Sequence, residues 1–256
     1  MSQELDIAIT AAQTAGNIIA TNYQQPITTK YKANHQLVTD TDLASDQAIK
    51  SVISAQFPNH AFFSEETGLS KNNSDFLWII DPLDGTTNFA HHLGNFCVSI
   101  ALTYKQSRQV GVVYNPLTQE LFTAEKNQGA YLNNQPIQPA TTKNINNAVI
   151  AISRGIYQRL TNAVRSYRVL GSTALSLCYV ACGRLDAQAD HQLNYYDAAA
   201  GALIAAEAGA TLTDFSNQPW QPSLTHKSHL LCAPPQIHQQ LINVIQLNPH
   251  ESPVTN

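Results

Sequence analysis

The sequence predicts a mixed α/β protein, and three observations carry that prediction. Residues 5–23 and 42–57 repeat apolar side chains at helical spacing. A continuous apolar run at 76–80 indicates a buried strand. From 95 to 132, short alternating segments separated by turn residues indicate an antiparallel meander. The length of 256 residues fits one large domain or two subdomains that share a core.

Composition narrows the class of protein. The apolar fraction of 43% is ordinary for a soluble globular enzyme, and the net charge of -4 argues against general nucleic-acid binding. No stretch approaches the length of a transmembrane helix, and the first residues lack the basic region of a secretory signal. The four cysteines form no C-x-x-C pair and indicate buried free thiols. We therefore expect a cytoplasmic enzyme that does not contact a membrane.

The first quarter of the chain predicts two helices. Residues 5–23 carry an apolar stripe, and the polar stretch 24–36 indicates a loop or a hairpin. Thr41 is the predicted N-cap of the helix over 42–57. Asp42 therefore lies in the first turn, where it either offsets the helix dipole or faces a site.

Adjacent glutamates follow the next predicted element. Residues 61–64 form a short strand that leads directly into Glu65 and Glu66. Such pairs are usually solvated surface, but these two stand shortly before a second group of acids.

That second group lies in the segment 78–89, which reads WIIDPLDGTTNF. Asp81 and Asp84 follow the buried strand, and Gly85 permits a tight turn. Thr86 and the residues after it start a short helix. Hard divalent cations prefer carboxylate oxygens, and phosphate binds backbone N–H groups at a helix start. The alternative is a simple turn, since Asp-Pro and Asp-Gly are common turn dipeptides.

Strands and polar turns fill the middle of the chain. His91 and His92 have no second ligand pair at zinc spacing, so we expect them at the rim of a site. Asn133 and Asn134 indicate a hairpin turn. The predicted strands of the meander are 95–104, 109–114, 120–124 and 129–132.

A polar stretch at 139–147 suggests a boundary between two subdomains. We predict an N-terminal α+β subdomain over 1–140 and a C-terminal α/β subdomain over 141–256, which closes the site. The elements predicted for the second part are a strand at 148–152, helices at 155–164 and 171–182, strands at 185–190 and 229–233, helices at 198–208 and 236–244, and a disordered tail after 248.

Polar residues mark the start of one of these helices. Gly171, Ser172 and Thr173 offer free N–H groups and hydroxyls, which suit the substrate side of an anion site. Ser172 as an ordinary N-cap is an equally good interpretation. Asp190 ends a predicted strand, and Asp197 opens the most helical stretch of the chain.

The segment DPLDGTTNF resembles the signature of the inositol monophosphatase family, the Mg²⁺-dependent, lithium-sensitive sugar-phosphate phosphatases. VTDTD before the second helix, the Glu-Glu pair and YDAAAG resemble further family elements. The resemblance covers roughly residues 6–244. The chain departs from the family pattern at Gln36, Ser64, Tyr196 and Asn217.

This resemblance implies a layered αβαβα sandwich of the inositol monophosphatase and fructose-bisphosphatase type. It also implies two or three Mg²⁺ ions, with Mn²⁺ as an alternative, and Asp81 bridging two of them. Five converging acids without basic partners require such cations. The implied ligands are Glu65, Asp81, the carbonyl of Leu83, Asp84 and Asp197.

The reaction implied by the resemblance is phosphomonoester hydrolysis by a metal-activated water. Thr86, oriented by Asp42, and Glu65 are implied to position that water. Backbone N–H groups of Gly85 and Thr86 are implied to bind phosphate.

The expected substrate is a small polyol phosphate, with inositol 1-phosphate the best single candidate. Asp190 aligns with a family acid that contacts inositol hydroxyls, and the helix start at Gly171, Ser172 and Thr173 is expected beside it. The sequence shows no evident basic pocket for a second phosphate. Fructose 1,6-bisphosphate, histidinol phosphate and a 3′-phosphoadenosine nucleotide remain alternatives with the same chemistry.

The expected partners follow from the same resemblance. It implies a homodimer. Some bacterial relatives also act as transcription-complex partners, which is a second class of function. The chain has only 14 Lys and Arg residues and no basic cluster with interleaved aromatics, so we expect no nucleic-acid partner.

Overall fold

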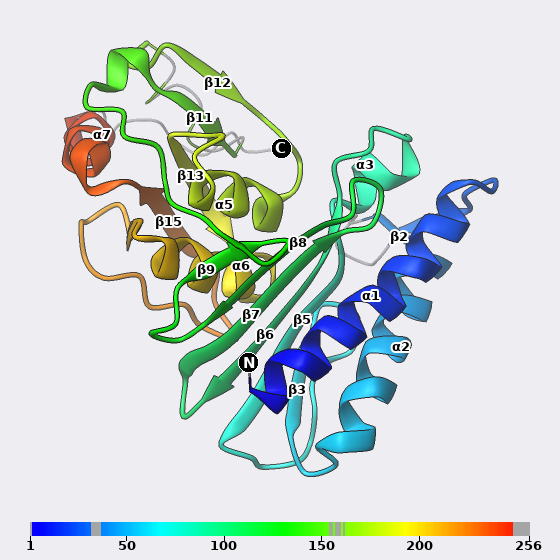
Figure 1. Cartoon of the computed structure of the whole chain (residues 1–256). Helices are drawn as coiled ribbons and strands as arrows, with labels where there is room; N and C mark the ends of the chain where they lie inside the picture. The colour runs from blue at the N-terminus through cyan, green and yellow to red at the C-terminus, as the bar shows by residue number, and fades with distance from the viewer. Residues whose placement is uncertain (1, 32–36, 154–155, 157–159, 161, 248–256) are drawn as a thin grey trace.

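The computed structural model describes residues 2–31, 37–153, 156, 160 and 162–247. Two β-sheets alternate with three layers of helices, as Figure 1 shows. An antiparallel pair of short strands, β1 (Thr29–Tyr31) and β2 (Leu37–Thr39), lies between the first two helices in the chain. It agrees with the hairpin alternative for 24–36, of which residues 32–36 lie outside the described residues. No helix in the described ranges has the length and apolar character needed to cross a bilayer.

The first sheet has eight strands in the order β10-β9-β8-β7-β6-β5-β3-β4. All neighbouring pairs are antiparallel except β3 and β5. Its strands are β3 (Ala61–Ser64), β4 (Gly68–Leu69), β5 (Phe76–Asp84), β6 (Cys97–Tyr104), β7 (Ser107–Asn115), β8 (Glu120–Glu125), β9 (Ala130–Leu132) and β10 (Gln135–Pro136). Asn133 and Asn134 both have positive φ in the turn between β9 and β10, so the predicted hairpin turn is confirmed.

Helices cover both faces of this sheet. On one face lie α1 (Gln3–Tyr23) and α2 (Asp40–Gln56), which form one core with β5, β6 and β7. On the other lie α5 (Thr173–Ala181) and α6 (Tyr195–Ala208). Their small buried residues let both helices lie close to a sheet on either side.

The second sheet has five strands in the order β12-β11-β13-β15-β14. One face packs on α5 and α6, and α7 (Pro235–Leu247) covers the other. Its strands are β11 (Val149–Ile152), β12 (Ser166–Arg168), β13 (Ala187–Leu193), β14 (Thr211–Thr213) and β15 (Ser228–Ala233), and a 3₁₀ turn, η1 (Ile145–Asn147), precedes β11. Three apolar cores between five layers confirm the predicted αβαβα sandwich.

Several boundaries differ from the sequence prediction. Thr39, not Thr41, caps α2, because its backbone N–H and hydroxyl both donate to Asp42 Oδ2, at 2.8 and 2.6 Å. The strand predicted to end at 80 continues to Asp84. The strand predicted to end at Asp190 continues to Leu193 through an irregular register.

Half of one predicted segment and all of another lie outside the described residues. These are the helix over 155–164 and the tail after 248. The short helix after the central acids, α3 (Thr86–Ala90), and the strand β3 have the predicted positions. The edge strands β4, β10, β12 and β14 were absent from the prediction, because two or three residues carry too little periodicity.

The contact between α6 and the first sheet generates a prediction. A Cβ on Gly111 in β7 would lie 2.8 Å from the carbonyl oxygen of Ala200, so Gly111→Ala forces backbone to move. We expect this variant to lower the free energy of unfolding by about 1–3 kcal/mol, measured by urea denaturation. Gln109→Ala, two residues earlier, should change it by less than about 0.5 kcal/mol. Equal stability of the two variants would show that the layers are not tightly packed there.

Candidate active site

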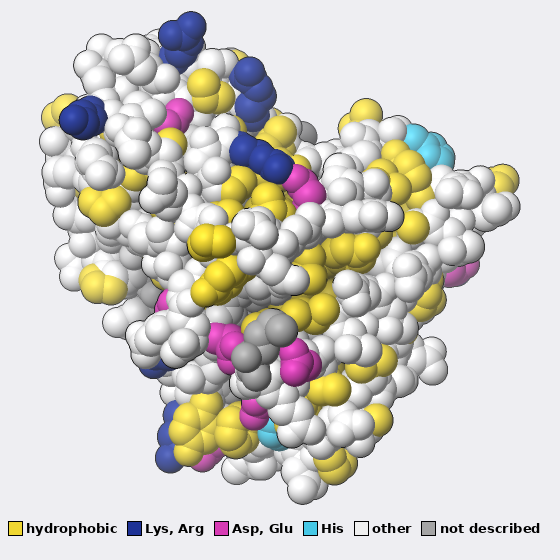
Figure 2. All heavy atoms as spheres, viewed as in Figure 1, with side chains coloured by type: hydrophobic (Ala, Val, Ile, Leu, Met, Phe, Trp, Pro, Cys, Tyr) yellow, Lys and Arg dark blue, Asp and Glu magenta, His cyan; other side chains and the backbone are white. Residues whose placement is uncertain are grey.

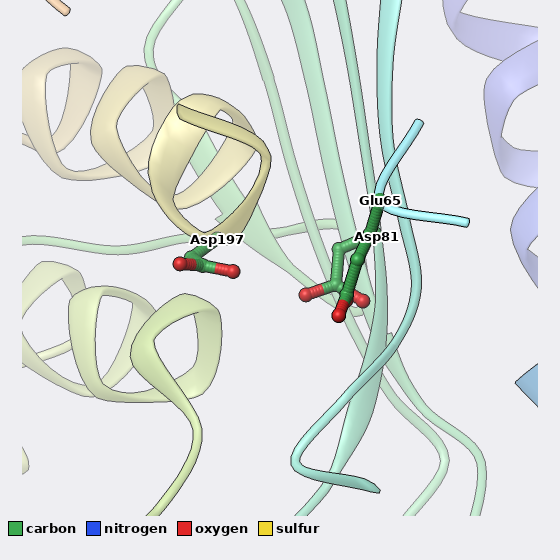
Figure 3. A group of neighbouring side chains, drawn as sticks. All are labelled: Glu65, Asp81 and Asp197. Carbon is green, nitrogen blue, oxygen red and sulfur yellow. The ribbon is translucent and has the colours of Figure 1, made fainter. Parts of the chain in front are cut away.

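Three carboxylates from different elements meet in one cavity. One oxygen from each of Glu65, Asp81 and Asp197 lies within 4.8 Å of the other two. Figure 3 shows Glu65 and Asp81 side by side, facing Asp197 on α6. The cavity has a volume of about 510 Å³, and Asp84, Gly85 and Thr86 also line it. No Lys or Arg of the described ranges lines this cavity.

A bulge in β5 brings Asp81 and Asp84 to the same side. Asp81 pairs with Ser99 and Asp84 with Cys97, so two residues on β5 oppose one on β6. Residues three apart in a regular strand point to opposite faces, and the extra residue reverses this alternation. Pro82, which has no N–H to donate, lies in the bulge. The D-P-L-D spacing therefore places both acids at one cavity.

The central carboxylates resist ionisation. Burial, followed by the charges of Glu65, Asp84 and Asp197, raises the pKa of Asp81 well above its usual value. Burial, followed by the charges of Asp84 and Glu65, likewise raises the pKa of Asp197. Burial raises the pKa of Asp84 to about 7, although hydrogen bonds from Ser172 and Ala174 oppose the shift. A cation bound in the cavity would lower the pKa values of these carboxyl groups.

Asp84 is tied to the start of α5. Its Oδ2 accepts hydrogen bonds from the Ser172 hydroxyl and the Ala174 backbone N–H, both at 2.7 Å. Ser172 also caps the helix by accepting from Leu175 N. The N-cap interpretation of Ser172 is therefore confirmed, and its hydroxyl in addition donates to Asp84. Gly171, with φ 74°, lines the cavity itself.

Asp190 lies inside β13 rather than at its end. It is 4% exposed within β13, and it is not among the described residues that line the cavity. Its carboxylate accepts hydrogen bonds from Gln188 and, at 3.3 Å, from the Thr173 hydroxyl. Burial raises its pKa. Thr173, the first residue of α5, thus links Asp190 in β13 to that helix.

Asp42 and Thr86 form a pair at the cavity. Thr86 Oγ1 lies 2.9 Å from Asp42 Oδ1 and 3.0 Å from the carbonyl oxygen of Leu83. The other oxygen of Asp42 closes the capping box of α2 with Thr39. Burial is the largest cause that raises the pKa of Asp42. Asp42 therefore closes the capping box of its helix and also accepts a hydrogen bond from Thr86, which lines the cavity.

Gly85 permits the turn into α3. Its φ is 96°, and a Cβ there would lie 2.8 Å from the carbonyl oxygen of Asn95. His91 lines the cavity as expected of a rim residue, while His92 packs against the ring of Tyr23 at 4.8 Å.

Sequence reasoning missed the residues that support Glu65. Asp46 and Ser64 are buried and hydrogen-bonded to each other beside the start of the Glu65 loop. Asp46 follows Asp42 at i+4 and so lies on the same helix face. That spacing is the one signal that could have found it.

The residues present fit a hard divalent cation. The clustered donors are carboxylate oxygens, which favour Mg²⁺ or Mn²⁺ over zinc or copper. Asp84 lies outside the 4.8 Å group that the described residues form, but its charge acts on Asp81. The fold and the site together define a layered α/β protein whose clustered acids suit Mg²⁺.

The chain belongs to the inositol monophosphatase family, whose model matches residues 1–249. The Nus factor SuhB of Pasteurella multocida is 38% identical over 261 residues, covering 96% of this chain and 97% of that protein. Inositol monophosphatase 3 of tomato (Solanum lycopersicum) is 39% identical over 234 residues, covering 84% and 87%. The crystal structure of the extragenic suppressor protein suhB from Bartonella henselae matches with a TM-score of 0.90 at 29% identity, covering 96% and 99%.

The raised carboxyl pKa values predict a pH-dependent stability. The pKa of Asp84 is about 7 in the folded protein against 3.8 for an unperturbed side chain. The folded state thus holds its proton more tightly, so stability in EDTA should fall as pH rises from about 4 to 7 and stay low above that. Added Mg²⁺ should raise the melting temperature more at pH 8 than at pH 5.

Asp81→Asn tests by mutation whether the buried carboxylate charge lowers stability. It removes a buried charge and keeps an oxygen for the 3.1 Å hydrogen bond from Leu83 N. We expect a higher melting temperature than wild type in EDTA at pH 8. Asp75→Asn, in an exposed ion pair, is the matched control and should change little. A pH-independent melting temperature in EDTA would contradict the raised pKa values of these carboxyl groups.

Proposed function

We propose that this protein is a Mg²⁺-dependent phosphomonoesterase that hydrolyses a small polyol phosphate, most simply inositol 1-phosphate. The observation that carries the proposal is the convergence of Glu65, Asp81 and Asp197 beside the Asp42–Thr86 pair. The family and the name of the tomato relative support the same reaction class. The reaction class and the substrate are separate claims with separate tests.

The ligand set we propose extends beyond the three clustered acids to the Leu83 carbonyl and Asp84. Two or three Mg²⁺ ions bound there would lower the pKa of a water and offset the charge of the phosphate, and Mn²⁺ is an alternative. Asp81, at the centre of the acids, is proposed as the shared ligand. Asp84 keeps one oxygen for the cavity because the other is held by α5.

Thr86 and Glu65 are proposed to orient the attacking water. Because Thr86 donates its hydroxyl proton to Asp42, its oxygen is left to accept a hydrogen bond from that water. Glu65 accepts the second proton of the water, and these two acceptors fix its lone pair toward phosphorus. The new P–O bond then forms opposite the ester P–O bond that breaks. The attacking water gives one proton to Glu65, and the leaving alkoxide takes up a proton from a solvent water.

The backbone N–H groups of Gly85 and Thr86 are proposed to bind the phosphate. They lie at the start of α3, and both residues line the cavity. A bisphosphate substrate would require a further cation. Among the residues that the structure describes, no Lys or Arg lines the cavity, which favours a monophosphate.

The polyol contacts are proposed to run through Thr173. Thr173 is partly exposed, whereas Asp190 is buried and accepts its hydrogen bond, so Asp190 would fix the Thr173 hydroxyl rather than meet the substrate. Neither residue is among the described residues that line the cavity. Gly171 contributes cavity wall beside Thr173. We further propose a cytoplasmic homodimer, in line with the family resemblance.

A second candidate function rests on the relatives named Nus factor SuhB. One of them matches 96% of this chain, and its name weighs against our expectation of no nucleic-acid or transcription partner. On the face seen in Figure 2, the Lys and Arg side chains form no continuous basic stripe, which favours a protein partner over direct RNA binding. Tagged wild type and Asp81→Asn should be compared for RNA polymerase capture. Capture by both would support a transcription role separate from catalysis.

The metal requirement is the first prediction of the proposed chemistry. Purified enzyme in EDTA should lose phosphatase activity, and Mg²⁺ should restore it. Asp81→Asn should lower kcat/KM at least about 100-fold, because a ligand charge is lost. Asp75→Asn is the surface control. Full activity of Asp81→Asn or of chelated enzyme would exclude the metal-dependent reaction.

Lithium sensitivity is the second prediction of the proposed chemistry. The family resemblance implies inhibition by LiCl in the millimolar range, because Li⁺ is a hard cation that supplies only half the charge of Mg²⁺. Activity should be assayed in up to tens of millimolar LiCl at fixed Mg²⁺, with KCl as the control. Unchanged activity in LiCl would remove this property from the proposal.

Preference for a polyol phosphate is the third prediction of the proposed chemistry. Asp190→Ala and Thr173→Val should raise KM for inositol 1-phosphate more than for an aryl phosphate, by about 1–3 kcal/mol of binding. Thr118→Val, on an exposed turn, is the control. A panel of phosphate esters at equal Mg²⁺ measures the preference. A bisphosphate favoured more than about tenfold, roughly 1.4 kcal/mol, would overturn the polyol assignment and leave the phosphatase reaction standing.

A further inference from the structure

Glu65 is the one member of the acid cluster whose backbone lies in a loop. Asp81 lies within β5 and Asp197 in the first turn of α6, whereas Glu65 follows the last residue of β3. A backbone hydrogen bond of 3.1 Å from Glu65 N to the carbonyl oxygen of Ile80 fixes the start of this loop. β4 beyond it is a two-residue edge strand and gives weak support.

A buried polar network holds this loop against α2. Ser64, 1% exposed, donates its hydroxyl to Asp46 Oδ1 at 2.5 Å. The same hydroxyl oxygen accepts a hydrogen bond from Glu66 N at 3.3 Å. Lys50 Nζ pairs with Asp46 Oδ2 at 2.6 Å and also contacts the Thr67 hydroxyl. The residues on both sides of Glu65 are thus bound to one turn of α2.

The same face of α2 also carries Asp42, which is hydrogen-bonded to Thr86. Asp42, Asp46 and Lys50 are four residues apart, so they form a stripe along one side of the helix. Asp42 orients Thr86, and Asp46 with Lys50 fixes the loop that carries Glu65. One rigid element therefore sets the distance between the two groups proposed to hold the attacking water.

The charges of Asp46 and Lys50 compensate each other, which suits a role in holding the Glu65 loop. Asp46 has a side chain only 6% exposed, and Lys50 supplies the matching positive charge. Without Lys50, the Asp46 carboxylate would be a further uncompensated negative charge near the cluster. The ion pair thus fixes Ser64 and Thr67 without adding to the repulsion among the acids.

We propose that Asp46, Lys50 and Ser64 are positioning residues for Glu65, and that they tune cation affinity at the cluster. This inference rests on the proposed function, because it takes Glu65 as a ligand. Groups that orient ligands typically change metal affinity about 10- to 100-fold when they are removed. None of the three touches substrate or a reacting atom in this account.

Direct cation binding tests the proposal, with Mn²⁺ titrated into metal-free protein and free Mn²⁺ followed by electron paramagnetic resonance. Ser64→Ala removes the hydroxyl, and Asp46→Asn keeps an oxygen but loses the charge that pairs with Lys50. Both variants should weaken Mn²⁺ binding about tenfold or more. They should raise the Mg²⁺ concentration for half-maximal activity in parallel, with a smaller change in kcat at saturating Mg²⁺.

Asp40→Asn is the matched control. It makes the same charge change on the same helix, but its ion pair with Lys30 is exposed, so Mn²⁺ affinity should remain within twofold of wild type. Melting temperature in EDTA reports folding separately. If Asp46→Asn does not fold, Ser64→Ala and Lys50→Met decide the question.

The possible outcomes separate the proposed metal site from the proposed positioning role of residues around Glu65. Wild-type Mn²⁺ affinity in folded Ser64→Ala and Asp46→Asn, with only a lowered melting temperature, would overturn the positioning role. If Asp81→Asn also bound Mn²⁺ as wild type does, the metal site itself would be refuted, and the inference would fail with it. Loss of affinity in Asp81→Asn, Asp46→Asn and Ser64→Ala, but not in Asp40→Asn, supports both.

Discussion

Three acids of the site are each bound to the start of a helix, and the rest of the site depends on these hydrogen bonds. Asp42 closes the capping box of α2, Asp84 accepts from the first turn of α5, and Asp197 closes the capping box of α6. Each uses one oxygen for its helix. The other oxygen of Asp42 accepts from Thr86, and those of Asp84 and Asp197 can face the cavity. The positive ends of the three helix dipoles also offset part of the negative charge.

The layered fold makes this arrangement possible. α2 lies on one face of the first sheet and α5 and α6 on the other, while β5 passes between them with Asp81 and Asp84 at its end. The acids therefore come from both sides of the sheet and meet at the end of its inner strand β5. Their mutual repulsion opposes the packing of the layers, which explains why a bound cation would stabilise the fold as well as the reaction.

The sequence predicted much of the fold and most of the acids, for identifiable reasons. Long periodic helices and the apolar run before Asp81 are strong local signals. The bulge that aligns Asp81 with Asp84 is invisible to periodicity, because it depends on pairing with β6. The burial of Asp190 depends on the continuation of β13. Asp46 was missed because one acid at i+4 on a helix resembles ordinary surface.

The central claim is that the acid cluster is a divalent-cation site, and a crystal soaked in Mn²⁺ tests it most directly. The account predicts an anomalous peak about 2.0–2.4 Å from carboxylate oxygens of Glu65, Asp81 and Asp197, which Mg²⁺ in excess should displace. Anomalous density only at lattice contacts or surface histidines, with the three carboxylates left without a cation at saturating Mn²⁺, would contradict it.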